Sequence, residues 1–185
     1  MSNRIEQAAA FAEAAHGSID HRRKYTGVPY TVHTRAVAAR VAACTDDEDM
    51  ICAAHLHDVL EDVAPSRPEF GQAAILQQFG FEVLRLVVEL TDVYTKRAYP
   101  DLNREVRKRA ESERLGRTSD KAKTIKLADL VDNGLDIVAN DPHFAGRYLR
   151  EKRDLVLHLE AGDLRLLTRA HQILVENAQH LTPKP

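Results

Sequence analysis

The spacing of apolar residues predicts helices along almost the whole chain. In residues 3–15, Ile5, Ala8 and Ala12 recur at helical intervals, and Gly17 follows as a stop signal. The same spacing predicts helices over residues 30–43, 48–61, 71–79, 81–91, 103–116, 119–139, 143–163 and 164–181. No segment shows the period-two alternation of a half-buried strand. The pattern therefore predicts an all-α fold.

Two segments interrupt the helical pattern. "FGFEV", residues 79–83, separates two helical stretches. "TDVYTKRAYPDLN", residues 91–103, is the least regular part, and we expect it to be a loop over a surface site. Neither is a low-complexity linker. We therefore expect residues 1–185 to form a single domain, one helical bundle with a core spanning roughly residues 5–175.

The composition fits an ordinary soluble globular domain, with 44% hydrophobic and 29% charged residues. The net charge of −2 provides no global basic field, which argues against a nucleic-acid partner, so any anion site must be local. Cys44 and Cys52 lack the spacing of a metal-binding pair, and we interpret them as reduced core cysteines.

The chain carries no recognisable targeting or membrane segment. "MSNRIEQAAAFAEAAHG" lacks the basic start, apolar stretch and cleavage site of a signal peptide. The longest apolar runs are far shorter than the ~20 residues of a membrane span. We therefore expect a cytoplasmic protein with no membrane partner, and the sequence leaves its oligomeric state open.

The segment "AAHLHDVLED", residues 53–62, places acids and histidines within an apolar helical pattern. His57 and Asp58 are adjacent, and Glu61 and Asp62 follow one helical turn later. Three neighbouring carboxylates repel one another unless a cation lies among them, which points to a metal. The alternative is a solvated acidic helix end, but the surrounding apolar residues argue against simple exposure.

A metal held by one His-Asp pair needs further ligands, and two residues elsewhere are candidates. His33 lies one helix earlier, and Asp129 is an acid in the apolar stretch "IKLADLVDN". A mid-helix aspartate is costly to bury without a partner, although a hydrogen-bonded structural role is the alternative. Mixed nitrogen and oxygen ligands with open positions suit Mn²⁺, Mg²⁺ or Fe²⁺ better than a closed structural zinc site.

Three motifs in order carry a resemblance to a known family: "RRKYTGVPYTVHTRAVA", "LHDVLED" and "SDKAKTIKLADLVDN". Over roughly residues 5–175, the chain resembles the hydrolase domain of the RelA/SpoT family. It is still more similar to the stand-alone small alarmone hydrolases, which are HD-superfamily phosphohydrolases without a synthetase domain. The resemblance implies an all-helical HD domain that degrades alarmones and does not make them.

The resemblance also implies a reaction and the residues that carry it. The reaction is hydrolysis of the 3′-pyrophosphate of (p)ppGpp, giving GDP or GTP and pyrophosphate. It implies Mn²⁺, or another divalent metal, held by His33, His57, Asp58 and Asp129. Glu61 and Asp62 match an acid pair implicated in activating, or relaying protons for, the attacking water. We expect His55 to be a packing residue or to support the ligands.

A polyanionic substrate requires cationic side chains around the site. The resemblance places Arg23 and Lys24 near the nucleotide and implies nucleoside contacts for Asn133 and Tyr148, although Tyr148 is equally well interpreted as a core residue. Most of the basic helix 103–116 is readily interpreted as a solvated face with ion pairs four residues apart. Because Arg104 and Lys108 share a face of that helix, we expect these two to contact pyrophosphate.

Two departures from the family pattern leave the substrate open. Thr34 stands where the family usually has proline, and Asp132 where it often has histidine or tyrosine. Neither removes a ligand. The alternatives are the same fold acting on an adenosine alarmone (ppApp) or on the 2′-phosphate of NADPH, and an inactive nucleotide-binding sensor. A helical nucleic-acid-binding protein is a weaker alternative, against which the acidic pI argues.

Overall fold

The computed structural model describes residues 3–177 of the chain. These residues form eight α-helices, one π-helical turn and one 3-10 turn, with an isolated bridge between Arg22 and Pro29 in place of any strand. The all-α prediction is therefore confirmed. The chain divides into two compact units, one ending at Thr91 and one beginning at Asp92, and each is described by itself. Residues 178–181 of the last predicted helix lie outside the described residues.

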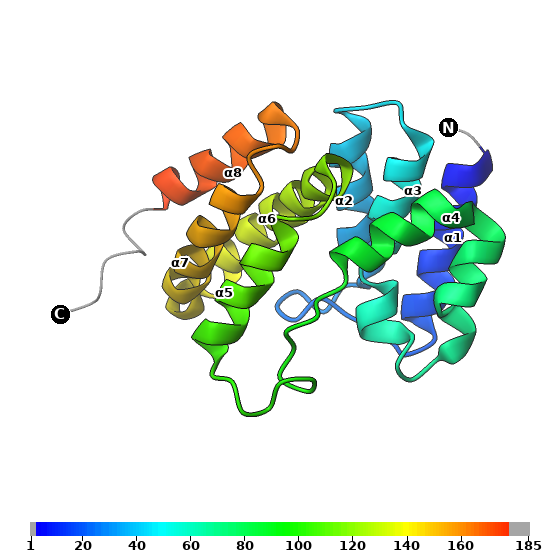
Figure 1. The fold of residues 1–185 in the computed structure, drawn as a ribbon, viewed down its shortest axis with the longest axis horizontal. Helices are drawn as coiled ribbons and strands as arrows, with labels where there is room; N and C mark the ends of the chain where they lie inside the picture. The colour runs from blue at the N-terminus through cyan, green and yellow to red at the C-terminus, as the bar shows by residue number, and fades with distance from the viewer. Residues whose placement is uncertain (1–2, 178–185) are drawn as a thin grey trace. The chain divides into compact units, whose positions relative to one another are not determined.

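The first unit is organised around a buried central helix (Figure 1). Its α-helices are α1 (Asn3–Gly17), α2 (Thr31–Ala42), α3 (Glu48–Leu56) and α4 (Gln72–Leu90). The 3-10 turn, Pro68–Phe70, precedes α4. Helix α3 packs against α1, α2 and α4, and every residue from Met50 to Leu56 is buried. This burial explains why α3 is apolar all round, as a helix in the middle of a core must be.

Helix α3 begins as expected but ends earlier than predicted. Asp47 caps it, accepting hydrogen bonds from the backbone amides of Asp49 and Met50. The sequence predicts one helix over residues 48–61, whereas the α-helix ends at Leu56 and a π-helical turn spans Val59–Val63. Single π-helical turns occur frequently at functional sites. Here the change of helix type falls on His57 and Asp58.

Helix α4 joins the two stretches that the sequence predicts on either side of residue 80. It is continuous from Gln72 to Leu90 except at Gly80, whose φ of 85° and ψ of 176° are non-helical. This region is open almost exclusively to glycine. The predicted interruption at "FGFEV" is therefore confirmed, as a kink at Gly80 between two helical stretches.

Replacing Gly80 by alanine is expected to lower the free energy of unfolding by roughly 1–3 kcal/mol. The cost arises from backbone strain, because the nearest atom to an added Cβ, on Arg4, is 3.9 Å away and leaves room for it. Gly17→Ala is the control: it meets nothing within 4 Å, is not at positive φ, and should stabilise by about 0.4–1 kcal/mol. Urea unfolding of both variants measures the difference. Equal changes in the free energy of unfolding for Gly80→Ala and Gly17→Ala would contradict the strain at residue 80.

The second unit contains the other four helices (Figure 1). They are α5 (Arg104–Leu115), α6 (Asp120–Asn140), α7 (Pro142–His158) and α8 (Leu164–Glu176). Helix α6 packs against α7 and α8, and α5 packs against α7. Side chains cap all four starts, namely Asn103, Ser119, Asp141 and Asp163. None of the described helices is long and apolar enough to cross a membrane.

The segment 91–103 is irregular, as predicted. The buried carboxylate of Glu111, on α5, accepts hydrogen bonds from the backbone amides of Val93 and Tyr94 at 3.0 and 2.9 Å. Tyr94 and Tyr99 stack within the segment, with ring centroids 4.8 Å apart. The loop is therefore anchored to the second unit.

Candidate metal centre

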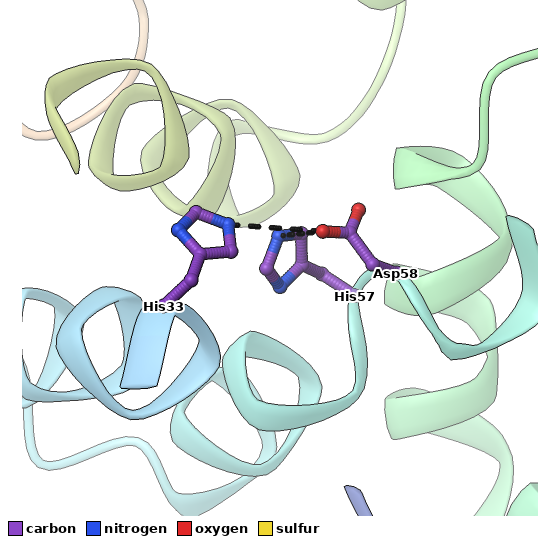
Figure 2. A group of neighbouring side chains, drawn as sticks. All are labelled: His33, His57 and Asp58. Carbon is purple, nitrogen blue, oxygen red and sulfur yellow. Dashed lines mark ion pairs between the residues drawn. The ribbon is translucent and has the colours of Figure 1, made fainter. Parts of the chain in front are cut away.

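Three of the predicted metal ligands converge in the first unit. His33 projects from the first turn of α2, and His57 and Asp58 follow α3 directly (Figure 2). The Oδ2 atom of Asp58 lies 2.9 Å from Nε2 of His57 and 3.7 Å from Nε2 of His33. One ligand atom from each residue lies within 4.8 Å of the others. Both imidazoles are buried, each 1% exposed.

The local backbone orients these side chains. The Nδ1 atom of His57 lies 2.9 Å from the carbonyl oxygen of Ala54, so an Nδ1–H donates there and leaves the Nε2 lone pair toward Asp58. Asp58 has φ −100° and ψ −2°, between the end of α3 and the π-helical turn. This break in the α-helix turns the two adjacent side chains toward one point. Two imidazole nitrogens and a carboxylate oxygen could hold a divalent metal ion.

An aromatic cluster that the sequence analysis missed lies beside this group. The hydroxyl of Tyr30 donates to Oδ2 of Asp58 at 2.6 Å. The ring of His21 stacks on Tyr30, and His16 lies next to both. The available sequence signal was the spacing of Tyr30, three residues before His33 at the start of a helix. The contact with Asp58, 28 residues away, has no local signal.

The acid pair lies within the π-helical turn, next to the three converging residues. The backbone amide of Asp62 donates to the carbonyl of Asp58 at 2.9 Å, and Oδ2 of Asp62 is 3.9 Å from Nδ1 of His21. Burial, together with the negative charges of Asp58 and Glu61, raises the pKa of Asp62 to about 8. A carboxyl group with such a pKa can hold a proton near neutrality.

His55 is buried within α3, and its Nδ1 atom has no hydrogen-bond partner in the structure. Burial lowers its pKa from 6.5 to about 4, with Arg35 and His57 adding to the effect. Burial likewise lowers the pKa of His16 to about 4. Both imidazoles are therefore neutral at pH 7, as the expected packing role of His55 requires.

The metal-free protein is expected to lose stability as the pH falls from about 6.5 toward 4. In that range the unfolded chain binds protons that the buried imidazole of His55 does not, and this residue alone contributes up to about 3 kcal/mol. Urea unfolding of His55→Gln in chelator should show a smaller fall in the free energy of unfolding between pH 6.5 and 4. The part of the fall that comes from His16 should remain. Exposed His143→Gln serves as the control. A pH dependence of His55→Gln as steep as that of the wild type would contradict this account.

The fourth predicted ligand, Asp129, belongs to the second unit. It lies on α6 and is 5% exposed. Its Oδ1 accepts from Asn133 at 2.5 Å, and its Oδ2 forms an ion pair with Lys126 at 2.9 Å. These partners offset the cost of burying the carboxylate. Asn133, predicted to contact the nucleoside, is thus fixed one turn from Asp129.

Lysine side chains surround a second acid in this unit, which the sequence analysis also missed. Asp92 forms an ion pair with Lys108 at 3.1 Å. Burial alone would raise its pKa, but Lys126, Lys108 and Lys152 outweigh burial and lower it. Burial lowers the pKa of Lys152 to about 8, with Lys126 and Lys108 contributing. The result is a local concentration of positive charge in a protein with a net charge of −2.

The other residues predicted to bind substrate are placed as follows. Arg104 makes a two-point ion pair with Glu151 at 2.6 and 2.8 Å. Arg104 and Lys108 both line a cavity of about 670 Å³ formed by α5, α7 and the cap residue Asn103. Tyr148 is buried on α7, with Lys152 Nζ 5.2 Å from its ring centroid. In the first unit, Arg23 is buried and Lys24 is exposed.

Comparisons with known proteins agree with this architecture. The model of the family described as HD domain matches residues 8–161. The MESH1 guanosine-3′,5′-bis(diphosphate) 3′-pyrophosphohydrolase of Drosophila melanogaster is 37% identical over 128 residues, covering 68% of this chain and 64% of that protein. The matched part is thus just under two thirds of the fly protein. The human protein of the same name is 35% identical over 71% of this chain and 68% of its own length.

A solved structure shows the same fold over nearly the full length. It is described as a metazoan ortholog of SpoT that hydrolyses ppGpp, and it matches with a TM-score of 0.79 at 30% identity. The match covers 95% of this chain and 96% of that one. The all-helical fold and the His-His-Asp group, which could hold a divalent metal ion, are those of an HD domain. The chain is a member of the HD-domain family, in the group of small alarmone hydrolases.

Proposed function

We propose that this protein is a metal-dependent hydrolase that removes the 3′-pyrophosphate of ppGpp, yielding GDP and pyrophosphate. The observation that carries the proposal is the convergence of His33, His57 and Asp58 within 4.8 Å. The fly and human relatives, which are named as 3′-pyrophosphohydrolases of this nucleotide, support the choice of substrate. The match covers 64% of the fly protein, so the activity of that protein is a proposal for this chain.

The metal in this proposal is Mn²⁺, with Asp129 as the fourth ligand. Two imidazoles and two carboxylates form a donor set of intermediate hardness, which suits Mn²⁺. A divalent ion bound there would lower the pKa of a water molecule and neutralise charge on the phosphoryl group. The role of Asp129 rests on the family resemblance and on its burial in a helix. Removing this carboxylate should weaken metal binding.

The remaining chemistry belongs to side chains of this chain. Glu61 and Asp62 lie one turn after the ligand Asp58. We propose that they take the proton of the attacking water. The phosphates would be bound by Arg23, Lys24, Arg104 and Lys108. The nucleoside would be bound by Asn133 and Tyr148. Phosphoryl transfer requires mainly positioning and charge stabilisation from these groups.

A substrate comparison tests this assignment. Purified protein is stripped with chelator, reloaded with Mn²⁺ and given ppGpp, ppApp or NADPH at matched concentrations. We expect pyrophosphate from ppGpp, with a higher kcat/KM than for ppApp and no orthophosphate from NADPH. Faster release from ppApp would reassign the base, and orthophosphate from NADPH would reassign the substrate. Binding of nucleotide without turnover would make the protein a sensor.

A further inference from the structure

Besides its two histidine neighbours, the carboxylate of Asp58 has a hydrogen-bond donor beside it. The hydroxyl of Tyr30 donates to Oδ2 at 2.6 Å, and the same oxygen faces Nε2 of His57 and Nε2 of His33. An ionised carboxylate only accepts hydrogen bonds, and the hydroxyl is 2.6 Å away, the short distance typical of a charge-assisted bond. Tyr30 therefore fixes which oxygen of Asp58 is presented to the imidazoles.

Tyr30 is itself fixed by its surroundings. Its ring stacks on that of His21, with centroids 3.8 Å apart and planes inclined by 8°. Its backbone amide donates to the carbonyl of His21 at 3.0 Å, next to the bridge that joins Arg22 and Pro29. Nδ1 of His21 lies 3.0 Å from Nδ1 of His16, on α1. Helix α1 and the loop that follows it thus hold one phenol in place.

We infer that Tyr30 is a positioning residue that sets the metal affinity of this centre by orienting Asp58, and that the stacked His21 ring holds Tyr30 for this purpose. The inference rests on the metal site proposed above. Carboxylates that bind metals are usually fixed by hydrogen bonds, and removing such a partner typically costs about 10–100-fold in metal affinity. Tyr30 does not need to touch the metal or the substrate for this effect.

The test is the Mn²⁺ dissociation constant, measured by titration of chelator-stripped protein. Tyr30→Phe keeps the stacked ring and removes only the hydroxyl, and we expect its dissociation constant to rise about 10–100-fold. Tyr99→Phe is the matched control, because it also removes a hydroxyl from a stacked tyrosine ring, on the loop of the second unit. Its affinity should equal that of the wild type. Metal-free Tyr30→Phe loses its hydrogen bond to Asp58 and should be somewhat less stable, but it should remain folded under the conditions of the titration, which separates positioning from unfolding.

A second pair of variants tests the support of Tyr30 even if Tyr30→Phe folds poorly. Both His21→Phe and His21→Ala remove the imidazole, but only His21→Phe keeps an aromatic ring against Tyr30. We expect His21→Phe to bind Mn²⁺ more tightly than His21→Ala. Wild-type affinity in Tyr30→Phe, or equal affinities in the two His21 variants, would overturn the inference while leaving the proposed metal site intact. Absence of Mn²⁺ binding by the wild type would overturn both.

Discussion

Asp58→Ala should lower kcat/KM for ppGpp by at least about 10³-fold and should abolish tight Mn²⁺ binding. The carboxylate supplies the oxygen that faces both imidazoles, at 2.9 Å from His57 and 3.7 Å from His33. Without it, the converging group keeps only two neutral nitrogen donors, and Asp129 is the one proposed ligand that still carries a negative charge to attract a divalent cation. No other residue in the converging group can replace that charge.

Two measurements on Asp58→Ala separate this cause from misfolding. Metal-free unfolding should show a folded protein, since Asp58 lies at the end of α3 and is partly exposed. A titration should show the loss of Mn²⁺ binding. Asp46→Ala, an exposed aspartate before α3, is the control and should keep wild-type turnover and metal binding. Retained turnover in Asp58→Ala would contradict the assignment of this residue as a ligand.

Glu61→Gln and Asp62→Asn should each lower kcat by about 10²–10⁴-fold while leaving Mn²⁺ affinity within a few-fold of the wild type. Both substitutions keep the shape of the side chain and remove its capacity to take a proton. The two effects should combine less than additively if the residues handle one proton together. Steady-state kinetics of the single and double variants, with Mn²⁺ titrations of each, measure this.

The split between turnover and metal binding is what identifies a proton-transfer role. A ligand would lose both properties, as expected for Asp58. If Glu61 or Asp62 only shaped the π-helical turn, its variant would be less stable but would keep the wild-type kcat at a temperature where it is folded. Wild-type kcat in both single variants would remove Glu61 and Asp62 from the mechanism.

The sequence predicted the fold better than the details of the site. Apolar spacing and caps such as Asp47 and Ser119 are local signals, so the helices appear close to their predicted bounds. The end of α3 at Leu56 was missed because the pattern of apolar residues continues through Leu60. The π-helical turn arises where α1 and α4 pack against residues 59–63, which helical periodicity does not reveal.

For the site, residue chemistry identified candidates, but long-range contacts were beyond the sequence. His33, His57 and Asp58 were predicted and do converge. Tyr30 and His21 were missed because their roles depend on a loop closed by the pairing of Arg22 with Pro29. The pairing of Lys108 with Asp92, and of Arg104 with Glu151, likewise joins distant segments. The roles assigned to Asp129, Glu61 and Asp62 stay predictions.

The most direct test of the central claim is the product of ppGpp hydrolysis, followed by ³¹P NMR with and without metal. Chelator-stripped protein should leave ppGpp intact, and restoring Mn²⁺ should produce GDP and pyrophosphate in equal amounts. That result would tie the His33, His57 and Asp58 group to removal of the 3′-pyrophosphate. Release of orthophosphate, or hydrolysis that proceeds equally in chelator, would contradict it.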